Sequence, residues 1–190
     1  LVADGRPALL FAQPAFTVPA NAPRTIDIAE MTRLGSEGAV PSAAARRSFE
    51  DLSTLLYTSG TSGRPKGVML SERNNFWGNT NLIHGNAVNP GSTFLCDMPL
   101  FHTAGLMAAT RTPLLAGGAV LVSEGFDPEM TLARMMDPAL KVTHYFSVPQ
   151  MAATLWNRPE FDAEKLRKIV AWAIGGAPNP KAQSERFLGA

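Results

Sequence analysis

The residues best suited to chemistry lie in one short stretch, residues 57–68, with the sequence Tyr-Thr-Ser-Gly-Thr-Ser-Gly-Arg-Pro-Lys-Gly-Val. It holds four Ser or Thr hydroxyls, three glycines and one lysine, Lys66. Glycine lets the backbone approach an anion closely, and successive N–H groups and hydroxyls can surround phosphate oxygens. Because phosphoryl and nucleotidyl transfer depend mainly on positioning and charge stabilisation, the stretch predicts a polyphosphate site.

Two alternatives to this interpretation exist. A Walker A loop requires glycine directly before its lysine and Ser or Thr directly after it. Here Pro65 precedes Lys66 and Gly67 follows it, so the Walker pattern fails on both sides. The second alternative, an ordinary Ser- and Gly-rich turn, stays open on these residues alone.

Two further segments have residues that suit a ligand site. In residues 98–106, His102 stands near the start of an apolar helical segment, where a histidine taken alone is more often structural. Residues 173–178 follow an apolar strand and precede a helix, and their small side chains equally suit a plain turn. Open α/β sheets bind ligands at the carboxyl ends of their strands, which is where this second segment would lie.

Short apolar runs alternate with segments of helical period along most of the chain, whereas residues 14–48 are mostly connection. A helix is expected to begin at Ser71, a good N-cap residue, and another at Pro149. We expect strands over 8–12 (buried), 25–28, 52–58, 67–70, 93–98, 119–123, 142–147 and 169–174, and helices over 71–84, 100–115, 128–136, 149–156 and 179–187.

Strands that alternate with helices predict an α/β fold, a mostly parallel sheet flanked by helices. We expect two parts. Residues 1–48 form a leading strand and a long Pro- and Ala-rich connection, and residues 49–190 form the α/β core. Because so long a connection is unusual inside a compact domain, we expect the piece it packs against to lie outside this chain.

Composition excludes several classes of protein. The 190 residues carry 17 basic and 16 acidic side chains, and 45% are apolar, so a disordered chain is excluded. The spread of Lys and Arg gives no basic face, and we expect no nucleic-acid partner. A lone cysteine, Cys96, forms no internal disulfide, and no apolar run is long enough for a transmembrane segment. These features favour a cytoplasmic protein.

Residues 58–71 resemble the phosphate-binding signature of the adenylate-forming superfamily, which comprises acyl-CoA synthetases, peptide-synthetase adenylation domains and luciferases. Family members often have threonine where this chain has Ser62 and histidine where it has Glu72. Residues 98–106 are similar to the carboxylate-pocket segment of acyl-CoA and aryl-CoA ligases, which favours the CoA-ligase branch. Residues 173–178 are similar to the turn against the adenine base, and residues 145–151 resemble the wall of the acyl pocket.

This resemblance implies an AMP-forming acyl-CoA synthetase that joins a carboxylic acid to CoA through an acyl-adenylate, with ATP, Mg2+ and CoA as cofactors. A fatty acid is the implied substrate, and a homo-oligomer stays open. Lys66 and His102 are the implied catalytic residues. The implied nucleotide-binding residues are Thr58, Ser59, Gly60, Thr61, Ser62, Gly63, Lys66, Gly67, Gly175, Gly176, Ala177 and Pro178; no metal ligand is expected within these residues.

Complete members of the superfamily are much longer than this chain. The acidic residue associated with Mg2+ and the catalytic lysine of the C-terminal domain have no counterpart here. We therefore expect an internal fragment of the large N-terminal domain that is inactive alone. The sequence leaves open a non-catalytic ATP-binding module, an interaction protein, an aryl-CoA ligase and a luciferase-like enzyme.

Overall fold

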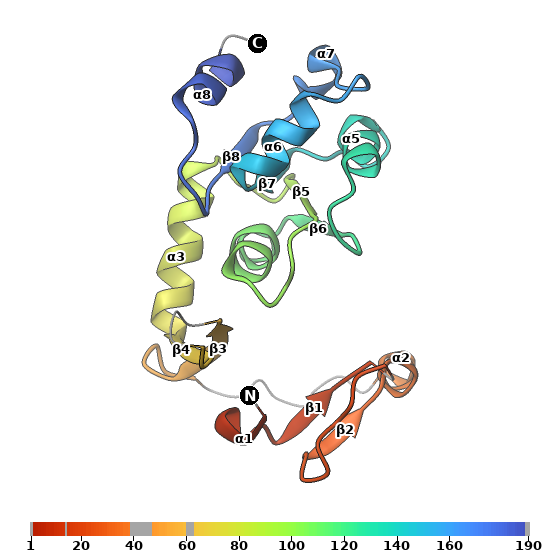
Figure 1. Cartoon of the computed structure of the whole chain (residues 1–190), viewed down its shortest axis with the longest axis vertical. Coiled ribbons are helices and arrows are strands. Elements are labelled where there is room, and N and C mark those ends of the chain that lie inside the picture. Colours follow the sequence, from red (N-terminus) through yellow and green to blue (C-terminus); the bar gives the residue numbers. More distant parts are fainter. Residues whose placement is uncertain (1, 14, 39–46, 60–62, 189–190) are drawn as a thin grey trace. The chain divides into compact units, whose positions relative to one another are not determined.

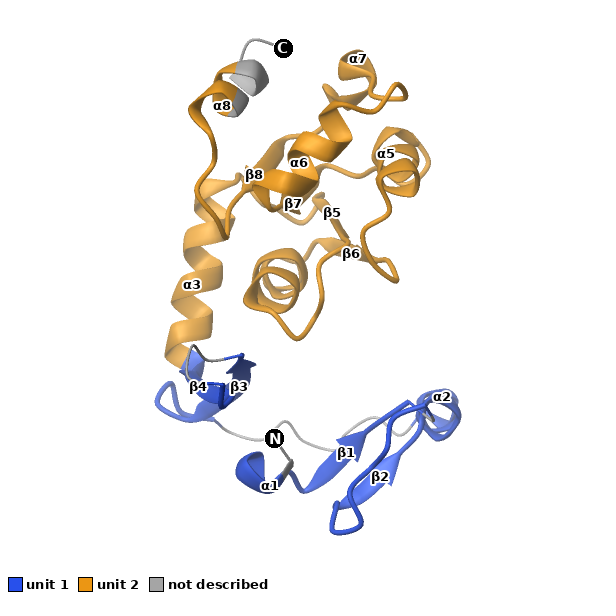
Figure 2. Cartoon of the chain, viewed as in Figure 1, with its two compact units in different colours: residues 1–72 blue, residues 73–190 orange. Residues whose placement is uncertain are grey.

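The computed structural model describes residues 2–13, 15–38, 47–59 and 63–188 (Figure 1). The chain divides into two compact units, Leu1–Glu72 and Arg73–Ala190 (Figure 2).

Unit 1 contains two small sheets. The strand β1 (Leu9–Phe11) pairs in parallel with β2 (Arg24–Ile26), and the short helix α1 (Val2–Gly5) precedes them. The strands β3 (Leu52–Thr58) and β4 (Lys66–Ser71) form an antiparallel pair. The strand expected over 8–12 is confirmed, but its predicted burial is wrong, because Leu9 and Phe11 are exposed.

The helix α2 (Ile28–Glu37) corrects the prediction of an irregular connection over these residues. Its signals were local. The Asp27 carboxylate accepts a hydrogen bond from the N–H of Glu30 at 2.8 Å, and Gly38 ends the helix with φ of 54°. Ile28, Met31 and Leu34 also recur at helical spacing, so the sequence carried a signal for this helix although none of its residues is buried. Residues 39–46 of the predicted connection lie outside the described residues.

Unit 2 is built on a parallel sheet of four strands in the order β6-β5-β7-β8, which confirms the predicted α/β class with its mostly parallel sheet. The helix α3 (Glu72–Gly85) leads into it directly after Ser71, as expected. The remaining elements are β5 (Thr93–Cys96), η1 (Ala104–Arg111), α4 (Thr112–Leu115), β6 (Ala119–Val122), α5 (Pro128–Met136), β7 (His144–Ser147), α6 (Pro149–Trp156), α7 (Ala163–Leu166), β8 (Ala171–Ile174) and α8 (Lys181–Leu188).

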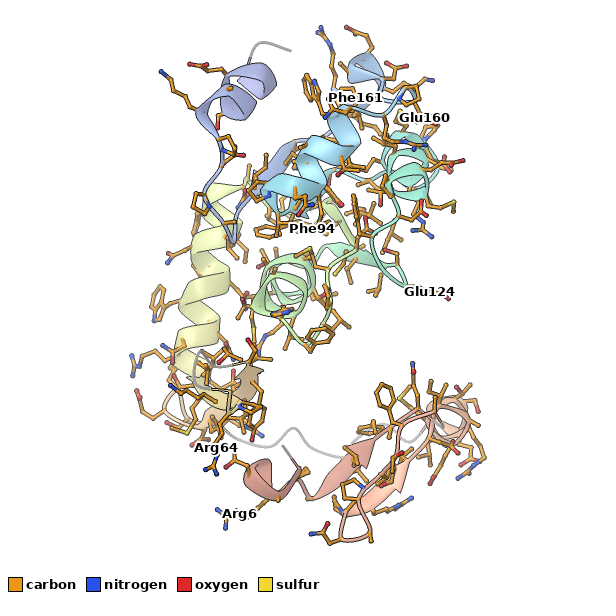
Figure 3. All side chains as sticks on the ribbon, viewed as in Figure 1. Arg6, Arg64, Phe94, Glu124, Glu160 and Phe161 are labelled. Carbon is orange, nitrogen blue, oxygen red and sulfur yellow. The ribbon has the colours of Figure 1, made fainter. Side chains whose placement is uncertain are left out.

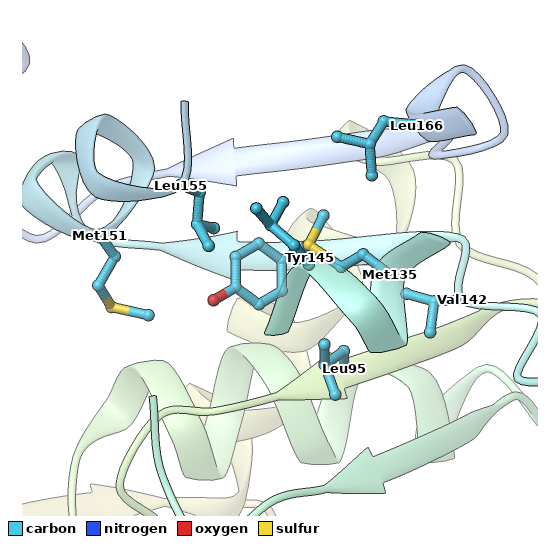
Figure 4. Close-up of a cluster of buried hydrophobic side chains, with 8 residues drawn as sticks. Leu95, Met135, Val142, Tyr145, Met151, Leu155 and Leu166 are labelled. Atoms are coloured by element: carbon cyan, nitrogen blue, oxygen red, sulfur yellow. The ribbon is translucent and has the colours of Figure 1, made fainter. Parts of the chain in front are cut away.

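Successive residues of the central strands point to opposite faces of this sheet, which places helices on both sides. On one face, Leu95 of β5 and Tyr145 of β7 pack against α5, α6 and α7 in a buried apolar cluster (Figure 4). On the other face, the rings of Phe94 and His144 stack with centroids 4.6 Å apart. The core of unit 2 therefore fixes the register of β5 and β7.

The segment expected to be a regular helix over 100–115 differs in kind. Residues 99–102 form a turn, η1 is a π-helix, and α4 completes the segment. Gly105 explains the packing of η1, because a Cβ there would lie 2.7 Å from the carbonyl oxygen of Met98 and closer still to that of Pro99. Such π-helical segments are rare and gather at functional sites.

Candidate functional site

The glycine-rich stretch joins the two antiparallel strands of unit 1. In their register Thr58 faces Lys66 and Tyr57 faces Gly67, so the loop lies at the end of the β3–β4 pair. Thr58, Ser59, Gly63 and Lys66 are exposed. The predicted site residues Gly60, Thr61 and Ser62 lie outside the described residues.

Two glycines of the stretch have structural reasons to be glycine. Gly63 has φ of 79°, a conformation that residues with a side chain rarely adopt. At Gly67 a Cβ would lie 2.9 Å from Cδ1 of Leu55 and 3.3 Å from Cε1 of Tyr57. The Tyr57 ring therefore packs over Gly67, beside the lysine that begins β4.

The loop end of the hairpin is held by a hydrogen bond within unit 1. The Tyr57 hydroxyl donates to the carboxylate of Asp4 at 2.6 Å. This bond raises the pKa of the Tyr57 hydroxyl, with smaller contributions from burial and from the Asp4 charge. Lys66 is exposed and lies on the facing strand, next to the Gly67 that faces Tyr57. Figure 3 shows the neighbouring Arg64 on the outside of the hairpin.

In unit 2 the predicted site segments lie at one edge of the sheet. His102 follows β5, residues 148–149 follow β7, and Gly175 follows β8. Because all four strands are parallel, the segments after them meet at the carboxyl edge. The strand order places the switch in winding direction between β5 and β7, which is where open α/β sheets bind ligands.

His102 is exposed at the end of the turn that leads into η1. Its backbone N–H donates to the carbonyl of Pro99 at 3.1 Å, and its own carbonyl accepts from the N–H of Leu106 at 2.9 Å. Its ring lies 4.9 Å from that of Phe101, centroid to centroid. The imidazole is thus available to a ligand, while its backbone is fixed on both sides.

The glycine-rich turn after β8 is anchored to β7. The N–H of Gly175 donates to the carbonyl of Ser147 at 3.1 Å. Gly176 has φ of 87°, and its backbone approaches Cγ1 of Val148 closely enough that a Cβ would lie 3.5 Å away. Gly176, Ala177 and Pro178 are exposed at the carboxyl edge of the sheet.

The predicted residues fall into two groups. Thr58, Ser59, Gly63, Lys66 and Gly67 come together in unit 1, whereas His102 and the turn at 175–178 share the carboxyl edge of the sheet in unit 2. At that edge, residues 97–101 and 122–125 line a cavity of about 300 Å³. Glu124, labelled in Figure 3, is exposed at its rim.

One residue at this edge was missed by the reasoning from sequence. Asp97, directly after β5, is 3% exposed, and its carboxylate accepts hydrogen bonds from Ser123, from Thr131 at 2.7 Å and from Tyr145 at 3.1 Å. An acidic residue that ends an apolar strand was the available signal. Its partners come from β7 and from segments after β6, and no spacing in the sequence links them.

The fold is that of an α/β protein with a parallel sheet, and a glycine-rich hairpin loop precedes that sheet along the chain. Residues 8–190 match the family model described as AMP-binding enzyme. The chain therefore belongs to the AMP-binding enzyme family, as the resemblance implied.

Relatives and solved structures agree with this membership. The chain is 34% identical over 140 residues to feruloyl-CoA synthase of Amycolatopsis sp, a match covering 74% of this chain and 28% of that protein. ATP-bound MatB from Rhodopseudomonas palustris superposes with a TM-score of 0.85 at 25% identity, covering 99% of this chain and 39% of that one. A malonyl-CoA ligase product complex with methylmalonyl-CoA and AMP gives 0.80 at 30% identity, covering 100% and 40%.

The chain thus spans less than a third of the curated relative it matches. Within the part that the structure describes, no helix is both long and apolar enough to cross a membrane. The same residues contain no group of three His, Cys, Asp or Glu side chains placed to share a metal ion.

Proposed function

We propose that this chain is the ATP- and carboxylate-binding part of an AMP-forming acyl-CoA synthetase. The observation that carries the proposal is the hairpin loop of Ser, Thr and Gly with the exposed Lys66 beside it, in a chain of the AMP-binding enzyme family. Backbone N–H groups and hydroxyls of such a loop suit the β- and γ-phosphates of ATP, and Lys66 suits the charge of departing pyrophosphate.

In this proposal the carboxyl edge of unit 2 receives the other reactants. His102 orients the carboxylate of the acid, and Gly175, Gly176, Ala177 and Pro178 form one side of the adenine slot. The exposed imidazole and the anchored turn support these roles, because each presents its ligand-facing atoms at the edge where parallel sheets bind ligands. In unit 1, residues 58–63 are the proposed phosphate-binding residues.

The remaining substrate assignments follow from the same family. We propose ATP and CoA as cosubstrates, because MatB has been solved with ATP bound and the malonyl-CoA ligase complex holds AMP and methylmalonyl-CoA. We propose a fatty acid as the carboxylate and Mg2+ as the metal, bound by an acidic residue outside these 190 residues. A cytoplasmic location is proposed on the lone, buried and free Cys96. The oligomeric state is left open.

The test is carboxylate-dependent ATP–pyrophosphate exchange on the full reading frame that encodes this chain. Lys66→Ala is expected to lower exchange by about a hundredfold, because it removes a charge that acts on the leaving group. The matched control is Arg64→Ala, which removes a charge from the same loop and is expected to keep exchange within about twofold of wild type. ATP binding without any exchange would instead support a non-catalytic nucleotide-binding module.

An aromatic acid is the second candidate substrate. Feruloyl-CoA synthase is among the relatives, and that observation favours an aryl-CoA ligase. Short, medium, long and aromatic acids should therefore be compared in the same exchange assay. Preference for an aromatic acid would replace the fatty-acid assignment without affecting the adenylation reaction.

A further inference from the structure

A buried carboxylate lies at the start of the segment that carries His102. Asp97 is the first residue after β5, and its side chain accepts hydrogen bonds from three hydroxyls. Oδ1 accepts from Ser123, while Oδ2 accepts from Thr131 at 2.7 Å and from Tyr145 at 3.1 Å. Buried polar groups are rarely tolerated unless satisfied, and hydrogen bonds to a carboxylate are stronger than neutral ones.

The donors come from three different elements around β5. Ser123 directly follows β6, Thr131 lies on α5 with no exposed surface, and Tyr145 belongs to β7. The bond to Tyr145 therefore crosses from β5 to β7, the pair of strands between which the winding direction switches. Burial, and then the charge of Asp97, raise the pKa of the Tyr145 hydroxyl, so that it stays a donor. Figure 4 shows its ring within the buried cluster.

The segment between Asp97 and His102 has little freedom of its own. Gly105 of η1 packs directly against the carbonyls of Met98 and Pro99, with no room for a Cβ. The Pro99 carbonyl in turn accepts the N–H of His102. The backbone is thus held at its start by the Asp97 side chain, in its middle by η1, and at its end by the turn.

We propose that Asp97 is a positioning residue: its three hydrogen bonds fix the start of the 97–102 segment and so set where His102 stands at the carboxylate-binding edge. The proposal rests on the proposed function. Asp97 does not touch the reacting atoms, and its effect on the reaction passes through the backbone to His102. Losing it should therefore weaken the binding of the acid more than the binding of ATP.

Two variants test this on the full reading frame. Asp97→Asn keeps the shape of the side chain but removes its charge and one acceptor oxygen. Thr131→Val removes one of the three hydroxyls that donate to Asp97, and it replaces Asp97→Asn as the test variant if Asp97→Asn does not fold. Glu129→Gln is the control, because it neutralises an exposed carboxylate on the same helix as Thr131.

The first measurement is the KM for each substrate in the exchange assay. Asp97→Asn is expected to raise the KM for the acid about tenfold, and Thr131→Val less, with the KM for ATP within about twofold of wild type. Glu129→Gln should change neither. A parallel rise in both KM values would indicate general loss of structure and would overturn the positioning role.

The second measurement does not depend on activity. The carbon-bound imidazole proton of His102, assigned by its loss in His102→Gln, is followed by NMR in protein with labelled histidine. Its signal should move in Asp97→Asn and not in Glu129→Gln, while the signal of His84 stays in place. An unmoved His102 signal in a folded Asp97→Asn protein overturns the proposal. If wild type shows no exchange, the proposed function fails, and this signal still decides the role of Asp97.

Discussion

Among single residues, His144 occupies a buried site that suits the neutral form of its ring. It is 1% exposed, Nε2 lies 2.9 Å from the carbonyl oxygen of Asn86, and Nδ1 lies 2.8 Å from the Thr143 hydroxyl. A neutral ring satisfies both contacts by donating to Asn86 and accepting from Thr143. Burial lowers the pKa of His144, and the bond to Asn86 offsets part of this effect.

This environment predicts a pH-dependent stability. The pKa of His144 in the folded protein lies below the ordinary value of 6.5. As the pH falls through 6.5, the unfolded chain therefore binds more protons than the folded protein does. The contribution of His144 is therefore fully present above pH 6.5 and is lost as the pH falls toward the lower folded pKa. Urea unfolding of wild type and His144→Gln at pH 8 and pH 5.5 checks this.

The wild type should lose more of its free energy of unfolding between these two pH values than the variant does. The difference between the two proteins isolates His144 from the other groups that titrate in this range. Two pH profiles that run parallel would contradict the prediction.

At the scale of elements, alanine substitutions at two helical glycines are predicted to change the free energy of unfolding in opposite directions. In η1, Gly105→Ala would place a Cβ against backbone carbonyls that cannot turn away, and should lower the free energy of unfolding by about 2 kcal/mol. In α3, Gly78→Ala meets nothing within 4 Å and should raise it by up to about 1 kcal/mol. Chemical unfolding of both variants tests the pair.

The exchange assay adds a functional check on Gly105. Because η1 holds the carbonyls beside His102, Gly105→Ala should also raise the KM for the acid, whereas Gly78→Ala should not. Equal stabilities for the two variants would show that η1 can shift away from residues 98–99 without cost.

An element was predicted well where residues close together in the sequence mark its start and its apolar face. The helices over 128–136 and 149–156 are confirmed with the expected bounds, since each begins with proline and carries regular apolar spacing. The helix α2 was missed although its N-cap Asp27 and its apolar residues at helical spacing were available signals, and the π-helical form of η1 has no signal in composition. Tertiary contacts at Gly105 accompany that form.

For the whole molecule, the length of chain bears on activity. The match to feruloyl-CoA synthase covers 28% of that protein. We expect the purified 190-residue chain to show no carboxylate-dependent exchange, because it matches only part of the length of that relative. The full reading frame, assayed beside it, is the positive control. Turnover by the short chain with any of the acids would disprove this expectation.

The expected boundary near residue 48 stays a prediction, and so do the roles of the site residues. What supports them is placement: Lys66 beside its hairpin loop, and His102 and Gly176 at the carboxyl edge of one sheet. The sequence could predict these positions because each follows a strand that an apolar run already marks.

The sequence by itself determined the α/β alternation, the phosphate-type loop and the family, because these depend on residues close together along the chain. Only the tertiary structure decided what Asp97 does. Its three partners lie 26, 34 and 48 residues away, and they meet because the strand order is β6-β5-β7-β8. Strand order is set by packing between distant segments, so no local pattern could reveal that a buried carboxylate holds the segment of His102.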